Sequence, residues 1–218
     1  MLHRVLRLLF PPKCVLCKKL LSEHETDLCH DCRINAPVYS KRNFKVSFVA
    51  RWTAVWYYKD NVRSSLLRYK FYGKRHYALT YGRLLAMKLQ TARMDDFDVL
   101  TWVPVGPLRR LTRGYDQVEL LANAVSSELG ITAVKLLRKV RNTPPQSAIN
   151  DAAKRRANVL NAYRVTQPDA VRGKRILLLD DVITTGSTLS ECAKTLLTAN
   201  AKEVNCATVA VACHDKKK

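Results

Sequence analysis

The spacing of apolar residues along the chain changes near residue 98, and the two halves therefore predict different elements. In the first half, the segment from Lys45 to Lys59 is rich in β-branched and aromatic residues, which predicts a strand or a hairpin. Apolar residues then recur at helical spacing, from Val62 to Tyr69 and again from Tyr81 to Leu89. We expect two helices to follow the strand.

From Asp98 onward the order is strand, loop and helix. An apolar run at Val99–Pro104 predicts a strand, a basic loop continues to Gly114, and the apolar spacing of Gln117–Leu129 predicts a helix that ends at Gly130. This order is typical of an α/β unit.

Two further strands are predicted at Arg175–Leu179 and Val204–Val211, with a helix from Leu189 to Ala199 between them. Both strands are almost continuously apolar, as in a parallel sheet that has helices on each face. The sequence therefore predicts the α/β fold class with a parallel sheet. Between the units, residues 141–158 contain Pro144-Pro145 and basic residues, which predicts a mobile loop that leads into a helix.

No apolar run approaches the roughly 18 to 20 residues that cross a bilayer, so we expect no transmembrane helix. The first ten residues are too short in their apolar part for a signal peptide and contain Arg4 and Arg7. They predict a short amphipathic helix that stops at Pro11-Pro12, and a transient membrane-surface contact stays open as an alternative. We expect a cytoplasmic protein.

Four of the seven cysteines form two CxxC pairs, Cys14 with Cys17 and Cys29 with Cys32, and eleven residues separate the pairs. This spacing lets four thiolates surround one Zn²⁺ ion. Two disulfides or a redox pair are the alternatives, but a chain without a secretory signal is expected in a reducing compartment. A four-cysteine site has no open position for a substrate, so we expect a structural zinc ion. We interpret the other three, Cys192, Cys206 and Cys213, as small buried apolar residues.

A phosphate-binding loop is predicted directly after the strand that ends at Leu179. Asp180 and Asp181 come first, the loop Thr184–Thr188 follows, and a helix begins at Leu189. A helix N-terminus offers unpaired N–H groups to a phosphate, and small hydroxyl residues add donors. Two carboxylates beside such a loop suit the hydroxyls of a sugar, so the whole element predicts a site for a sugar phosphate. The alternative is a helix cap with two solvated acids. The predicted loop residues are Thr184, Thr185, Gly186, Ser187 and Thr188.

The chain has 218 residues, and its 38 Lys and Arg exceed its 18 Asp and Glu by 20. Residues 1–90 contain 18 basic and 5 acidic side chains, a net charge of +13, and residues 91–218 contain 20 and 13, a net charge of +7. Nucleic acid is the commonest partner of so basic a surface. Solubility alone is the other interpretation. The content of hydrophobic residues, 47%, is ordinary for a folded protein and excludes a disordered one.

The string from Leu177 to Thr188 resembles the phosphoribosyl-pyrophosphate (PRPP) signature of type I phosphoribosyltransferases. With the CxxC pairs, the Tyr69–Gly73 segment, the stretch from Val103 to Gln117 and the Gln146–Asn158 segment, the chain resembles the ComF/GntX family of competence-related proteins almost from end to end.

The resemblance implies a phosphoribosyltransferase-like domain at residues 41–218, in which residues 41–90 form a hood region, after a zinc-binding module at residues 1–40. It also implies that Asp180 and Asp181 act as catalytic residues on PRPP with Mg²⁺, and that Arg109 and Arg113 bind its pyrophosphate. Lys70 is expected to contact a phosphate or to lie in solvent. Arg155, Arg156 and Asn158 are expected to close over PRPP or to bind DNA.

Two functions follow from these expectations. The preferred one is a PRPP-binding protein that handles single-stranded DNA during natural transformation, with other DNA-uptake proteins as further partners. The alternative is an active phosphoribosyltransferase with a small-molecule acceptor, although no base-binding element is recognisable. A regulator that senses PRPP is a third class.

Overall fold

A computed structural model describes residues 11–40, 45–141 and 152–212. The predicted helix at residues 1–10, the greater part of the predicted mobile loop and Cys213 lie outside these residues. The elements are, in chain order, α2 (His30–Asn35), β1 (Trp52–Tyr57), α3 (Asp60–Phe71), α4 (Tyr77–Thr91), β2 (Val99–Trp102), α5 (Pro107–Arg113), α6 (Gln117–Leu129), β3 (Leu137–Lys139), α7 (Ala152–Val159), β4 (Tyr163–Val165), β5 (Arg175–Ile183), α8 (Ser187–Thr198) and β6 (Glu203–Val211).

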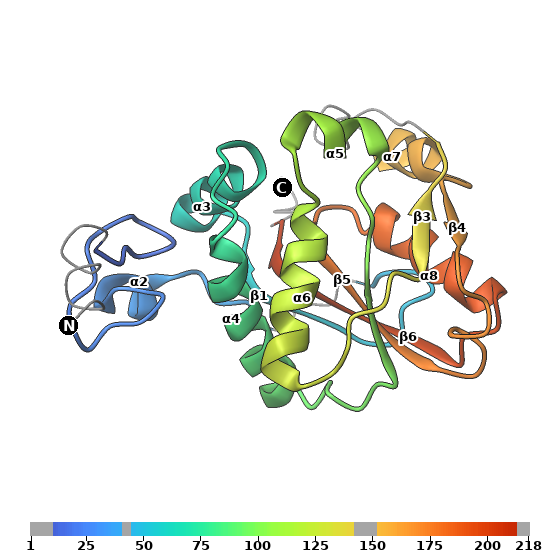
Figure 1. The fold of residues 1–218 in the computed structure, drawn as a ribbon, viewed down its shortest axis with the longest axis horizontal. Helices are drawn as coiled ribbons and strands as arrows, with labels where there is room; N and C mark the ends of the chain where they lie inside the picture. The colour runs from blue at the N-terminus through green and yellow to red at the C-terminus, as the bar shows by residue number, and fades with distance from the viewer. Residues whose placement is uncertain (1–10, 41–44, 142–151, 213–218) are drawn as a thin grey trace, which may run out of the picture.

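The main sheet of the described chain is parallel and has the order β1-β6-β5-β2. The predicted parallel sheet is thus confirmed. In Figure 1, α4 and α6 lie on one side of this sheet, and α8 lies on the other with the short antiparallel pair β3–β4. A small module that contains α2 lies at one end of the molecule, and α3 and α4 stand between it and the sheet.

The residues of β5 alternate between two apolar clusters, one on each face of the sheet. Leu177 and Leu179 belong to the cluster under α4 and α6, whereas Ile176 and Leu178 belong to the cluster under α8. A strand that is buried on both faces must be apolar at successive positions, which is the pattern that the sequence displays.

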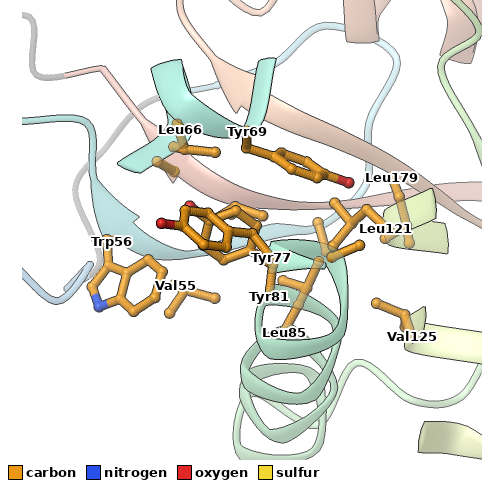
Figure 2. Packing of buried hydrophobic residues seen from close by; sticks show 14 of the residues in the cluster. Val55, Trp56, Leu66, Tyr69, Tyr77, Tyr81, Leu85, Leu121, Val125 and Leu179 are labelled. Atoms are coloured by element: carbon orange, nitrogen blue, oxygen red, sulfur yellow. The ribbon is translucent and has the colours of Figure 1, made fainter. Parts of the chain in front are cut away.

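The first cluster is rich in aromatic rings from α3 and α4. Tyr81 lies with its ring centroid 5.3 Å from that of Tyr69 and 6.1 Å from that of Tyr77, in edge-to-face arrangements. Figure 2 shows these rings between Trp56 of β1 and Leu121 of α6. Edge-to-face pairs fix the orientation of the rings as well as burying apolar area. The contact of Tyr69 with Tyr81 therefore holds α3 against α4.

Close packing of α4 on α6 depends on Gly82. A Cβ atom at this position would lie 2.4 Å from the Cβ of Ala124, which is closer than real carbon atoms approach. The glycine therefore allows the two helices to touch along their backbones. The spacing of apolar residues along the chain does not single out this glycine.

Four predicted elements differ from the structure in their extent. The expected basic loop before Gly114 contains the short helix α5, which begins at Pro107 and ends at Gly114 in the left-handed region with φ 72°. The strand β5 continues through Asp180 and Asp181 to Ile183, and α8 begins at Ser187 instead of Leu189. Lastly, the predicted strand or hairpin from Lys45 is a strand only from Trp52.

Residues 41–90, predicted as a hood region, contribute β1 to the main sheet and α4 to one of its faces. The division of the chain near residue 40 remains a prediction.

Candidate functional site

The cysteines of the two CxxC pairs meet in space. The Sγ atoms of Cys14, Cys17, Cys29 and Cys32 all lie within 4.8 Å of one another, and those of Cys17 and Cys29 are 3.6 Å apart. Four sulfurs at about 2.3 Å from a tetrahedral zinc ion are separated by about 3.8 Å, so the four thiols fit this metal. Among the described residues, these four cysteines are the group found with donor atoms close enough to hold a metal ion. Together they would supply all four ligands of a tetrahedral zinc ion.

The helix α3 holds the backbone of the first CxxC pair. Arg68 donates from Nη2 to the carbonyl oxygens of Val15 and Leu16 at 3.0 and 2.6 Å, and Ser65 donates from Oγ to the carbonyl of Val15. Because Val15 and Leu16 lie between Cys14 and Cys17, these bonds attach the metal-binding turn to α3. The metal module and the sheet domain therefore share this helix as a common support.

The predicted carboxylates lie at the carboxyl end of β5. Asp181 is buried, and its Oδ1 is 2.7 Å from Nζ of Lys70, while its Oδ2 accepts a hydrogen bond of 3.0 Å from Nε2 of Gln117. Asp180 accepts a hydrogen bond of 2.8 Å from the backbone N–H of Asp181. Lys70, which the sequence places either in solvent or on a phosphate, is an ion-pair partner of Asp181 in this structure.

Burial has a large effect on the first carboxyl group. It raises the pKa of Asp180 to about 8, the negative charge of Asp181 adds to this effect, and Lys70 opposes it. Two adjacent carboxylates in a confined space resist being ionised together. A cation or a set of hydroxyl donors placed here would favour the ionised form of Asp180.

The predicted phosphate loop follows β5 and leads directly into α8. Gly186 has φ 74° at the N-cap of α8, a conformation that glycine adopts without strain. The hydroxyl groups of Thr185 and Ser187 are 2.7 Å apart, and Thr184 and Thr188 are half-buried on either side. The N-terminal amide groups of α8 thus lie beside small hydroxyl residues, as phosphate binding requires.

The loop after β2 lies beside this site because β2 and β5 are neighbouring parallel strands, with Trp102 opposite Leu179. Asp116 joins the start of this loop to α6, since its carboxylate accepts hydrogen bonds from the N–H groups of Val105, Val118 and Glu119. Asp116 therefore fixes where α5 and its arginines lie.

The two predicted arginines have different surroundings. Arg109 is half-buried, and burial together with the positive charge of Arg113 lowers its pKa. Arg113 donates to Oε1 of Gln117 at 2.9 Å, and Gln117 in turn donates to Asp181. A chain of hydrogen bonds therefore connects the basic loop with the carboxylate of β5.

Two polar residues of the β3–β4 pair, Lys139 and Tyr163, could not be predicted from the sequence as part of the site. Nζ of Lys139 lies 5.7 Å from the ring centroid of Tyr163, and both side chains interact electrostatically with Asp180 and Arg109. Burial lowers the pKa of Lys139 to about 8, and the charge of Arg109 acts in the same direction. Lys139 belongs to a run of basic residues, and only its place in the fold distinguishes it from the others.

A pocket of about 400 Å³ opens beside Lys70, between the end of α3 and α5. It is lined by Lys70, Phe71, Gly73, Arg109, Thr112, Arg113 and Tyr115. Through Lys70, this pocket adjoins the carboxylates of β5.

Comparisons with known families assign a class to this arrangement. Residues 119–218 match the phosphoribosyl transferase domain, and residues 5–43 match the double zinc ribbon domain. The chain thus has a type I phosphoribosyltransferase-like fold with a zinc ribbon at its N-terminus, as predicted, and the ribbon with its four cysteines supports a structural zinc ion.

The relatives have names from DNA uptake and utilization. The chain is 27% identical over 199 residues to competence protein F of Haemophilus influenzae. The matched region covers 88% of this chain and 82% of that protein. It is 29% identical over 191 residues to competence protein ComFC of Streptococcus pneumoniae, with 86% and 77% covered. The predicted resemblance to competence proteins is thus confirmed by homology to competence protein F and to ComFC.

A third relative is matched over a shorter region. The DNA utilization protein YhgH of Salmonella typhi is 34% identical over 140 residues, or 62% of this chain and 60% of that protein. Among solved structures, glutamine PRPP amidotransferase from B. subtilis has a TM-score of 0.46 at 22% identity, over 65% of this chain and 30% of that one.

No helix among the described residues has both the length and the apolar character that crossing a membrane requires.

Proposed function

We propose that this chain binds PRPP together with Mg²⁺ at the carboxyl end of β5 and handles single-stranded DNA in the cytoplasm during DNA uptake. The observation that carries the proposal is the position of Asp181, which lies two residues before the end of β5, the strand from which the loop into α8 continues. Names of the relatives, competence protein F and ComFC, support the role in DNA uptake.

In this proposal each group has a chemical role. Asp180 and Asp181 accept hydrogen bonds from the ribose hydroxyls, and the loop Thr184–Thr188 holds the 5′-phosphate with its amide and hydroxyl donors. Arg109 and Arg113 bind the pyrophosphate, for which a guanidinium group offers two parallel donors. Carboxylate and phosphate oxygens are the ligands that Mg²⁺ prefers.

Calorimetry tests the PRPP site. Titration of the zinc-containing protein with PRPP and Mg²⁺ should give saturable heat, and Asp181→Asn should abolish it, because the amide keeps the shape but offers one acceptor oxygen in place of two. Asp169→Asn is the matched control, since the Asp169 side chain is 96% exposed and lies on a distant turn. Unchanged affinity in Asp181→Asn would remove this residue from the site.

DNA binding is tested separately by its dependence on salt. Binding that neutralises even three phosphates of a single strand should weaken roughly 20-fold between 50 and 200 mM salt, because the condensed counterions are released. Fluorescence anisotropy with a labelled oligonucleotide measures this slope. Affinity that stays flat across this range would contradict binding through the basic surface.

An active phosphoribosyltransferase with a small-molecule acceptor is the second candidate. It is favoured by Asp180, because a carboxyl group whose pKa is raised to about 8 exchanges its proton near neutral pH, as general acid–base catalysis requires. Release of pyrophosphate from PRPP in the presence of a panel of bases and amines would establish turnover.

A further inference from the structure

The pocket between α3 and α5 is lined by an exposed aromatic ring, and a second exposed ring follows it in the chain. Phe71 lines it with 57% of its surface exposed, and the next residue, Tyr72, is 71% exposed. Large apolar side chains gathered around a hollow are typical of a binding surface, whereas single exposed ones are not.

Cations accompany these rings. The guanidinium carbon of Arg113 lies 4.8 Å from the ring centroid of Phe71, and that of Arg75 lies 4.7 Å from the ring centroid of Tyr115. Lys70 and Arg109 complete the basic lining, and none of the described residues that line the pocket is acidic. The charge of the pocket therefore fits an anionic occupant, and its rings fit a planar one.

We propose that this pocket is the base-stacking site for single-stranded DNA, in which a nucleobase lies on Phe71, which lines the pocket, and on its neighbour Tyr72, while Arg75, which contacts the lining residue Tyr115, binds an adjoining phosphate. This inference rests on the DNA-handling part of the proposed function and adds the place and the mode of binding. Base–aromatic stacking accepts every base, because each has a π-face, and arginines beside the rings hold the backbone.

A DNA strand bound in this pocket would lie next to the proposed PRPP site. Lys70 lies between the two, since it lines the pocket and its Nζ contacts Asp181 at 2.7 Å. Arg113 likewise faces both, through the ring of Phe71 on one side and Gln117 on the other. A base in the pocket is thus placed next to the carboxylates that are proposed to hold ribose.

A pair of oligonucleotides separates stacking from charge. Fluorescence anisotropy of the zinc-containing protein is measured with a labelled twelve-nucleotide strand of thymidines and with an abasic strand of the same length and charge. The protein should bind the thymidine strand about tenfold more tightly than the abasic strand, because only the former can stack. Equal affinity for the two strands would overturn the proposal.

Substitutions of the two exposed rings test whether the stacking takes place at this pocket. Phe71→Leu combined with Tyr72→Leu should remove most of the preference for the thymidine strand, because leucine keeps apolar bulk but has no ring. Phe48→Leu is the matched control: Phe48 is a 54% exposed aromatic residue that precedes β1, at the sheet edge opposite the carboxyl ends of the strands, and its loss should leave the preference intact.

The outcomes are distinct. A preference that survives in the Phe71 and Tyr72 variant, whose folding is checked by its melting temperature, would overturn this site while DNA handling stands. A wild-type protein that binds neither strand would refute the DNA-handling function and this site with it, whereas PRPP binding would be unaffected by that result.

Discussion

Lys70 and Asp181 form an ion pair of 2.7 Å between the last turn of α3 and the carboxyl end of β5, and their side chains are only 19% and 7% exposed. A carboxylate in such a place needs a partner, because its desolvation is otherwise uncompensated. The pair therefore fixes the position of α3 over the site.

We expect Lys70→Met to lower the free energy of unfolding by about 2 kcal/mol, because it leaves the buried carboxylate of Asp181 with one partner fewer. Urea unfolding followed by far-UV circular dichroism measures this loss. Lys74→Met removes an exposed lysine four residues away and should cost less than about 0.5 kcal/mol. Equal losses in the two variants would show that the ion pair contributes no special stability.

Removal of the metal should weaken PRPP binding as well as stability. Without zinc the turn around Val15 and Leu16 loses its constraint, and Arg68 loses the fixed carbonyls that hold α3. The measurements are zinc content, melting temperature and PRPP affinity before and after chelation. Arg68→Met keeps all four cysteines and should reproduce part of the affinity loss with zinc still bound. PRPP affinity that is insensitive to both changes would mean that α3 transmits nothing between the two sites.

Gly82→Ala should destabilise the protein by roughly 1 to 3 kcal/mol, although alanine favours helices more than glycine does. The added Cβ would lie 2.4 Å from that of Ala124, so α4 and α6 would have to separate. Thermal unfolding measures the change. The double variant with Ala124→Gly removes the nearest contact and should recover part of the loss; no recovery would point to a cause other than this contact.

The affinity for PRPP should vary with pH because Lys139 loses its charge as the pH rises. Its pKa of about 8 means that the free protein carries this charge at pH 7 and has largely lost it at pH 9. Loss of this charge should therefore weaken the binding of an anionic ligand about tenfold between pH 7 and pH 9, relative to a variant that keeps the charge and shares the titration of Asp180. Lys139→Arg keeps a charge at both pH values, so its affinity should fall less over the same range. Parallel pH profiles of the two proteins, measured by calorimetry, would exclude Lys139 from the ligand site.

Elements whose signals are local in the chain could be predicted from the sequence. The helix α6 runs from Gln117 to Leu129 as predicted, because Asp116 caps its start and Gly130 its end. The positions of Asp180, Asp181 and the loop Thr184–Thr188 could be predicted equally well, because one continuous string of sequence contains them; their binding of PRPP remains a prediction. The helix α5 was missed because its buried face is small, although Pro107 and Gly114 mark its two ends.

The remainder of the site depends on contacts between distant segments. Lys70 meets Asp181 across more than a hundred residues of chain, and Lys139 reaches the site only because β3 pairs with β4 beside α8. Neither lysine differs from a solvated one in its neighbours along the sequence. Charge and spacing alone therefore could not distinguish them from the many other basic residues.

The first apolar cluster runs without interruption from Cys14 and Leu16 through Leu66 and Tyr69 to Leu179. Chain order suggests a cut near residue 40, yet the packing does not stop there. A fragment that began after this point would present an uncovered apolar wall to water and would self-associate, and the ribbon alone would lose the surface on which it rests. Each part therefore depends on the other for the cover of its apolar surface.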